Sequence, residues 1–232
     1  MSFAYSPKIV TDGLVFYVDA ANPKSYVSGS TIWNDISKNN NDGTLTNGPI
    51  FDPANKGSID FDGTNDLVVF NSINSLPSFS ISIWFKCTGP GDAGGGTLTI
   101  YNTLFGFNGG KRILVATSTN TGIAEGRVLV QMGGSNYFSN ISGIAETNSW
   151  NNVVYTFEPN TAILYLNAVQ QTPQTNSSVS FPTADIFLGA YSNPIVAYAM
   201  KGNIANTTIH SRALSATEVL QNYNATKTRF GL

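Results

Sequence analysis

The residues of this 232-residue sequence that could do chemistry are the carboxylates of Asp60, Asp62 and Asp66. They lie in the stretch SIDFDGTNDLVVF, residues 58–70, of a chain in which charged residues make up only 11%. Carboxylates spaced this closely could bind a metal ion, act as an acid and base, or cap a turn. These alternatives predict a calcium-dependent binding protein, an enzyme and a plain scaffold, respectively.

A calcium site needs only oxygen ligands, which carboxylates, amide side chains and backbone carbonyls supply. Asp62, Asn65 and Asp66 fall within one tight loop, and Asp19, at the end of the first expected strand, would join them if that strand lies alongside. An Asp-Gly pair with a nearby Asn is also typical of a structural turn. The sequence therefore predicts a turn, and leaves open whether that turn holds Ca²⁺.

Hydrolysis of a glycan would need two carboxylates roughly 5 to 9 Å apart, one of them acting as an acid. Asp60 and Asp62 face the same side of an expected strand, so a glycoside hydrolase remains the least favoured alternative. None of the four glutamates has a second acidic residue at the sequence spacing that such a catalytic pair would need. The only histidine, His210, lies in an alternating strand pattern, where a structural imidazole is expected. We therefore expect that the protein is not an enzyme.

Sugar-binding surfaces combine aromatic rings with amide and hydroxyl groups on a pre-formed shallow site. Such side chains are adjacent in three expected loops. The candidate ligand-binding residues are Tyr101 with Asn102, Asn136 with Tyr137, and Tyr191 with Asn193. Packing at a sheet edge would explain each pair equally well, so both interpretations stay open.

The composition argues against several classes of partner. The net charge is −2 and no Lys/Arg cluster is present, which disfavours nucleic acid. No apolar run approaches the roughly 18 to 20 residues of a membrane span, and the N-terminus lacks the pattern of a signal peptide. We expect a virion-surface or extracellular location reached without a signal peptide, or otherwise a cytoplasmic one. Cys87 ends an apolar strand and is expected to be a buried thiol.

Short strand-like runs separated by turn signals must position the candidate residues. In one of them Phe79, Ile81, Ile83 and Phe85 fall on one face, which is the pattern of a half-buried strand. The clearest runs are residues 13–19, 79–87, 112–117, 127–132, 152–158, 162–167, 185–190 and 203–210. They predict an all-β, two-sheet antiparallel sandwich in a single domain, 13–232, after an N-terminal arm, 1–12. The tryptophans at 33, 84 and 150 are expected in its core.

One helix is expected at about 215–226. Ser215 and Glu218 form a capping box, and Val219, Leu220 and Tyr223 give an apolar stripe. The helix is expected to cover an edge or end of a sheet, and Phe230 is a candidate anchor for the tail beyond it.

The ordered segments resemble a known family, the laminin-G-like (LamG or pentraxin-like) domain of the concanavalin A-like lectin/glucanase superfamily, from about residue 13 to 223. They are GLVFYVDAANPKSY, WNDIS, NDGTLTNGP, GSIDFDGTNDLVVF, FSISIWFK, WNNVVYTFEPNTAILYLNAVQ, FLGA and GNIANTTIHSRALSATEVLQNYN. The C-terminal segment ALSATEVLQNYNATKTRFGL also resembles modules of bacteriophage structural proteins.

The resemblance implies a jelly roll that binds glycans or proteins on its concave face or rim loops, often near a calcium ion. A few related branches are glycoside hydrolases. Two departures stand out: Ala168 replaces the family's usual Gly, and Ala205-Asn206 replaces an Asp-Glu pair, whose role is therefore in doubt here.

The expected function is a non-catalytic lectin-like recognition module, displayed on a phage virion, that binds host-surface glycan or decorates the shell. The alternative is a structural virion protein, such as a capsid cement, spacer or tail-fibre component, that binds other subunits. Association into a homo-oligomer is compatible with both.

Overall fold

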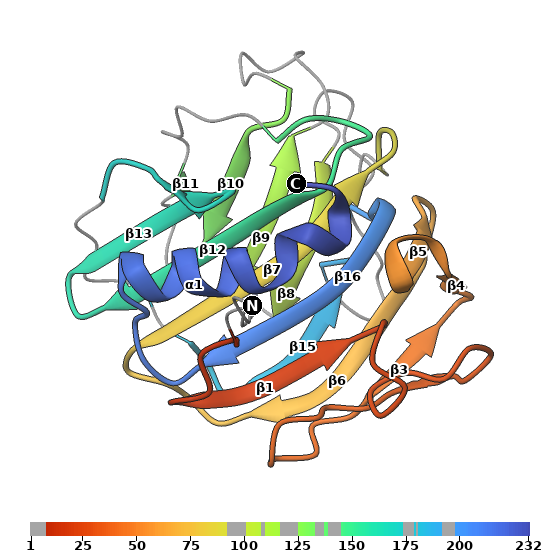
Figure 1. Cartoon of the computed structure of the whole chain (residues 1–232), viewed down its shortest axis with the longest axis horizontal. Coiled ribbons are helices and arrows are strands. Elements are labelled where there is room, and N and C mark those ends of the chain that lie inside the picture. Colours follow the sequence, from red (N-terminus) through yellow and green to blue (C-terminus); the bar gives the residue numbers. More distant parts are fainter. Residues whose placement is uncertain are drawn as a thin grey trace, which may run out of the picture.

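The computed structural model describes residues 8–91, 101–107, 110–116, 125–132, 145–173, 179, 181–191 and 198–232, and the backbone of 137–138. These residues form two antiparallel sheets packed face to face, with a C-terminal α-helix across one of them (Figure 1). The expected all-β sandwich is therefore confirmed.

Eight strands make up the first sheet. Their order is β14 (Val169–Gln170), β13 (Thr161–Leu166), β12 (Asn151–Glu158), β7 (Phe79–Cys87), β16 (Lys201–His210), β5 (Ser58–Asp62) and β4 (Ile50–Asp52), with β1 (Leu14–Asp19) also paired to β16.

The second sheet also has eight strands. Their order is β11 (Tyr137–Phe138), β10 (Val128–Gln131), β9 (Arg112–Ala116), β8 (Tyr101–Phe107), β15 (Ala184–Leu188), β6 (Leu67–Ile73), β3 (Gly43–Thr46) and β2 (Ile32–Trp33).

The opening stretch 58–70 is two strands rather than one. Its first half is β5 of the first sheet and its second half begins β6 of the second sheet. The residues between them, 63–66, therefore carry the chain from one layer of the sandwich to the other.

Alternating apolar side chains close the core, as the sequence predicts. Phe79, Ile81, Ile83 and Phe85 of β7 are fully buried in the cluster that fills the space between the sheets. Side chains of the second sheet, such as Ile113 of β9, pack into the same cluster. Cys87 at the end of β7 is buried as expected, and its burial raises the pKa of its thiol to about 12.

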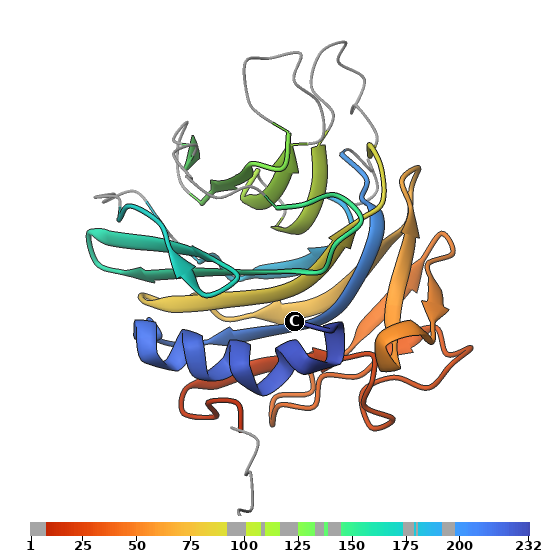
Figure 2. The ribbon, with the colours of Figure 1, turned by 45° about the horizontal axis from the view of Figure 1, so that its top comes forward.

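The helix α1 (Ala216–Thr226) lies on the face of the first sheet that points away from the core (Figures 1 and 2). The predicted capping box is confirmed, because Ser215 and Glu218 exchange side-chain and backbone hydrogen bonds. Val219 of α1 is fully buried against the sheet. The predicted apolar stripe was wrong at Leu220, whose side chain is 48% exposed. None of the described helices is long and apolar enough to cross a membrane.

The short helix η2 (Lys227–Phe230) fixes the tail. The Phe230 ring stacks on Trp84 with centroids 4.3 Å apart and lies 4.6 Å from the Trp150 ring. Phe230 therefore anchors the tail as expected. All three tryptophans are buried; Trp33 belongs to the core between the sheets, whereas Trp84 and Trp150 pack beneath the tail.

Candidate functional site

The outer face of the second sheet, the one that points away from the core, carries an unusual set of side chains. Ile113 and Val115 of β9 belong to the core, so the alternation of a strand directs Arg112 and Leu114 to the outer face. The neighbouring residue of β8, Gly106, is paired with Arg112 and lies on the same face.

Gly106 makes room for a chain crossing. An added Cβ at this position would lie 3.1 Å from the backbone oxygen of Tyr191, closer than neighbouring atoms normally approach. The lack of a side chain therefore lets the segment after β15 pass over β8 at this point. That crossing brings Tyr191 next to Arg112.

Four side chains meet here, and we call Tyr101, Arg112, Tyr191 and Tyr198 the Tyr–Arg cluster. The Cζ atom of Arg112 lies 4.5 Å from the Tyr191 ring centroid and 4.7 Å from that of Tyr198. The Tyr101 and Tyr198 rings make an edge-to-face contact at 5.6 Å. Each of the four side chains is half-buried. Cation–π contacts of this kind hold the guanidinium in place.

Tyr198 is held in a left-handed backbone conformation, with φ of 53°. This conformation is rare for a bulky residue and costs about 1–3 kcal/mol, so the surrounding structure must enforce it. Two hydrogen bonds do so: Thr103 N donates to Tyr198 O at 3.1 Å, and Met200 N donates to Gly189 O at 2.7 Å. The ring of Tyr198 is thereby fixed over Arg112.

Three buried polar atoms on this face have no hydrogen-bond partner: Arg112 Nε, Gln131 Oε1 and Thr103 Oγ1. Gln131 lies directly opposite Arg112 in the β9–β10 pairing. Thr103 pairs with Leu114, two residues along β9 from Arg112. Leaving such an atom unpaired costs roughly 1–3 kcal/mol, so a group that bonded to these atoms would be stabilised here.

The structure brings together two of the residues expected to bind a ligand, Tyr101 and Tyr191. Their neighbour Asn102 was assigned wrongly, because it is fully buried. Its Nδ2 donates to Gly89 O at 3.0 Å and its Oδ1 accepts from Lys201 N at 2.6 Å. Asn102 thus connects β8 to the start of β16.

The remaining candidates, Asn136, Asn193 and the side chain of Tyr137, lie outside the described residues. Sequence reasoning missed Arg112 and Tyr198. Alternation within RILVAT places Arg112 opposite the core-facing residues, which was a usable signal, but nothing local pairs it with Tyr198.

The Asp62–Asp66 loop forms a tight corner. Asp62 Oδ1 accepts from Thr64 N at 2.7 Å, and Asp66 Oδ2 accepts from Asp62 N at 3.0 Å. The side chain of Asn47 donates to Asn65 O at 2.8 Å. Asp66 is only 4% exposed, and its burial raises the pKa of the carboxyl group. One oxygen of each carboxylate and the Asn65 carbonyl are thus engaged in bonds that shape the turn.

Asp19 lies apart from this loop. It pairs with Asn206 of β16, whereas Asp62 pairs with Lys201, five residues along the same strand. Five residues of strand span about 16 Å, so the two carboxylates do not meet. Asp19 instead binds Arg229 at 2.7 Å. Within the described part of the chain, no group of three or more His, Cys, Asp or Glu side chains is placed to hold a metal ion.

Asp60 lies on the outer face of the first sheet, on the side of the molecule opposite the Tyr–Arg cluster. Burial raises the pKa of its carboxyl group, and the nearby charge of Asp52 adds to this effect. Its neighbour along the strand, Asp62, is occupied in the turn.

A family model described as the concanavalin A-like lectin/glucanases superfamily matches residues 62–220. The chain belongs to this superfamily. Its described residues form the corresponding lectin-like jelly roll. Comparison with curated protein sequences finds no relative.

Several solved structures share the fold of this superfamily member. Domain 4 of AbnA, an extracellular arabinanase of Geobacillus stearothermophilus solved with arabinotriose, is 18% identical. The match covers 91% of this chain and 98% of that domain, with a TM-score of 0.66. At such identity the likeness concerns the fold alone.

Two larger proteins contain a similar domain. Trypanosoma rangeli sialidase in complex with sialic acid matches with a TM-score of 0.69 and 12% identity, over 97% of this chain and 36% of the sialidase. The receptor-binding domain of botulinum neurotoxin type G matches with a TM-score of 0.63 and 15% identity, over 91% and 51%. The chain thus spans about a third to a half of these proteins.

The two departures from the superfamily pattern have clear structural settings. Ala168 has φ of 64°, so it occupies the left-handed conformation that the usual Gly favours. Ala205 lies at an irregularity between β16 and β7 and packs with Trp84 and Phe230. Asn206 is 5% exposed beside it. The place of the acidic pair is therefore covered by the C-terminal tail.

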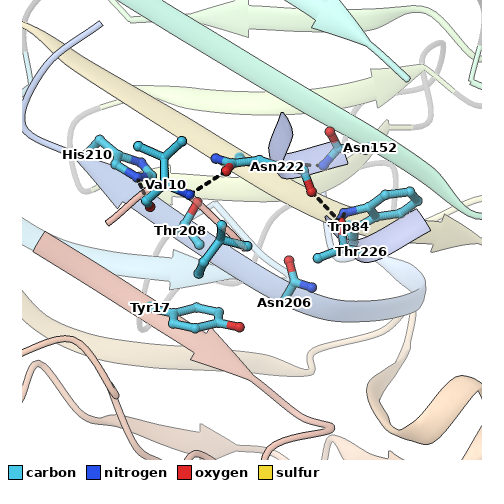
Figure 3. A pocket seen from close by; sticks show the side chains of 11 residues that line it. Val10, Tyr17, Trp84, Asn152, Asn206, Thr208, His210, Asn222 and Thr226 are labelled. Carbon is cyan, nitrogen blue, oxygen red and sulfur yellow. Dashed lines mark hydrogen bonds between the residues drawn. The ribbon is translucent and has the colours of Figure 1, made fainter. Parts of the chain in front are cut away.

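A pocket beneath α1 is lined by polar residues of the first sheet, including Asn152, Asn206 and His210 (Figure 3). Its volume of about 20 Å³ is large enough for a water molecule but too small for a sugar ring. His210 Nε2 lies 3.0 Å from Val10 O, and Asn222 Oδ1 accepts from Val10 N at 2.7 Å. Burial lowers the pKa of His210. This imidazole is structural, as predicted, and the pocket fastens the N-terminal arm.

Proposed function

We propose that this chain is a non-catalytic recognition module that binds glycans at the Tyr–Arg cluster, on the outer face of the second sheet. The observation that carries the proposal is the position of Arg112, within 4.7 Å of two tyrosine rings and beside unpaired polar atoms. Aromatic rings stack on the apolar faces of sugars, and fixed polar groups bind their hydroxyls. The superfamily supports this assignment, since its fold is lectin-like.

Glycan-array binding of the protein with Tyr191→Ala and Tyr191→Phe variants tests the proposal. We expect Tyr191→Ala to weaken binding about tenfold or more, because a stacked ring is worth about 1–3 kcal/mol, while Tyr191→Phe retains the ring. Leu220→Ala, on the exposed face of α1, is the remote control. Binding that survives Tyr191→Ala would place the site elsewhere.

The proposal that the module is non-catalytic rests on the position of its carboxylates. Within the described residues, the Tyr–Arg cluster contains no acidic side chain, and Asp60 and Asp62 lie on the first sheet. We expect incubation with a bound oligosaccharide to release no new reducing ends, measured by mass spectrometry. Release that disappears in the Asp60→Asn/Asp62→Asn double variant, with its melting temperature unchanged, would instead establish a glycoside hydrolase.

We also propose display on a phage particle, where the module would contact host-surface glycan. The support is the resemblance of the C-terminal segment to phage structural modules. Immunogold labelling of the phage that encodes the chain tests this, and unlabelled particles would overturn it. Particle association without glycan binding would favour the alternative, a cement or spacer protein.

A further inference from the structure

We propose that the sugar bound at the Tyr–Arg cluster carries a carboxylate, as uronic and sialic acids do. This inference rests on the proposed glycan binding and specifies its ligand class. It follows from the charge of Arg112, from the placement of the two rings on adjacent sides of its guanidinium, and from the polar atoms around it.

The charge of Arg112 is not neutralised by the described part of the protein. Arg229 pairs with Asp19 at 2.7 Å, and Arg212 pairs with Glu218 at 2.6 Å and with Asp12 at 2.8 Å. Arg112 has no comparable carboxylate among the described residues, although it is half-buried. A guanidinium withdrawn from water without a counterion creates a preference for an anion.

The two tyrosine rings contact the Arg112 guanidinium from adjacent sides. The Tyr191 and Tyr198 ring centroids are 6.4 Å apart, whereas each lies less than 5 Å from Arg112 Cζ. The rings therefore flank the guanidinium on adjacent sides instead of enclosing it from opposite sides. The Nε atom has no hydrogen-bond partner. A planar guanidinium fork matches a carboxylate with two parallel hydrogen bonds, a geometry that a neutral hydroxyl cannot offer.

The surrounding atoms suit the rest of a sugar acid. Gln131 Oε1 is an acceptor and Thr103 Oγ1 both donates and accepts, and both lack partners. Gln131 faces Arg112 across the β9–β10 pairing, and Thr103 faces Leu114, two residues along β9, across the β8–β9 pairing. Ring hydroxyls adjacent to a bound carboxylate would satisfy them. A site with one cation, two neutral polar groups and three tyrosine rings thus favours an acidic sugar over a neutral one.

Calorimetric titration of the full chain tests this with matched ligands that differ only in charge. The first pair is trigalacturonate and its fully methyl-esterified form, and the second is sialyllactose and the methyl ester of its sialic acid. We expect at least one acid to bind about tenfold or more tightly than its neutral counterpart, and to lose affinity as salt is added. The pair that discriminates identifies the uronic or the sialic source.

Two variants assign the preference to Arg112. Arg112→Gln should abolish it, whereas Arg112→Lys, which keeps the charge but not the planar fork, should retain only part of it. Unchanged melting temperatures would exclude a folding defect. Equal binding of acid and neutral forms, or a preference that survives Arg112→Gln, would overturn the inference. If neutral glycans bind in a Tyr191-dependent manner, the proposed function stands without it; if no saccharide binds, the proposed function itself fails.

Discussion

Arg229 and Asp19 form an ion pair at 2.7 Å that joins the C-terminal tail to the first strand, and their side chains are only 9% and 14% exposed. Arg229 Nε also donates to Asn55 O at 2.7 Å, and a further donor reaches Gly57 O. One side chain thus connects three segments that are far apart in the sequence.

Arg229→Gln should therefore destabilise the fold strongly. We expect the free energy of unfolding to fall by about 2–4 kcal/mol, because Asp19 and two backbone carbonyls lose their partner. Urea denaturation provides the measurement. Arg212→Gln is the matched control, since its pair with Glu218 is more exposed, and there the loss should be about 1 kcal/mol or less. Equal losses in the two variants would contradict the special role of Arg229.

Ala168→Gly should stabilise the protein by about 1 kcal/mol, because Ala168 occupies a left-handed conformation that strains any residue with a Cβ. Thermal unfolding would show a higher melting temperature. The adjacent Asn167→Gly is the control. Asn167 is also left-handed, but its side chain accepts from Asn152 N at 2.8 Å, so its loss should destabilise. A lower melting temperature for Ala168→Gly would contradict the proposal that the left-handed conformation of Ala168 strains the folded protein.

Calcium should leave the melting temperature unchanged, because the Asp62 and Asp66 carboxylates already accept backbone hydrogen bonds. The comparison is between millimolar CaCl₂ and EDTA. A ligand that binds only the folded state raises the melting temperature by mass action. A rise with calcium that Asp66→Asn abolishes would show that the loop holds the ion.

Glu218 should contribute to acid sensitivity. The hydrogen bond from Arg212 is the main cause that lowers the pKa of Glu218 from its usual 4.5 to about 2. A depressed folded-state pKa gives stability that is present above the unfolded value and is lost as the pH falls towards 2. Glu218→Gln should therefore cost about 1 kcal/mol near pH 7 and nothing near pH 2. Urea denaturation at both pH values measures this, with exposed Glu158→Gln as the control. A cost that is independent of pH would contradict it.

The strands could be predicted because their signal is local. Phe79–Cys87 was predicted with the bounds that the structure shows, since alternation identifies the side chains that face the core. The prediction that this strand is half-buried was wrong, because Ser80, Ser82 and Trp84 on its other face are also buried. Ser80 and Trp84 bond to Arg212 and Thr226 of the C-terminal segment that covers this face. Stretch 58–70 was harder. Its alternation continues through Asp62, although the chain there leaves one sheet for the other.

The site depended on information that no local pattern contains. Asn102 is buried near an irregularity between β8 and β9, at Thr103 and Phe105, which shifts the register of the two strands. Tyr191 reaches Arg112 because the chain crosses over Gly106, and Tyr198 contacts the same guanidinium. Residue type predicted that Tyr101 and Tyr191 would belong to a ligand-binding site. Only the path of the chain in the structure shows that the tyrosines of the Tyr–Arg cluster gather around Arg112.

The tail that closes on Trp84 and Trp150 lies on the first sheet, together with α1 (Figure 2). The Tyr–Arg cluster faces the opposite way. A carrier attached after Leu232, whether a biosensor tag or a particle, would thus be joined on the side of the first sheet, with the aromatic face directed away from the carrier.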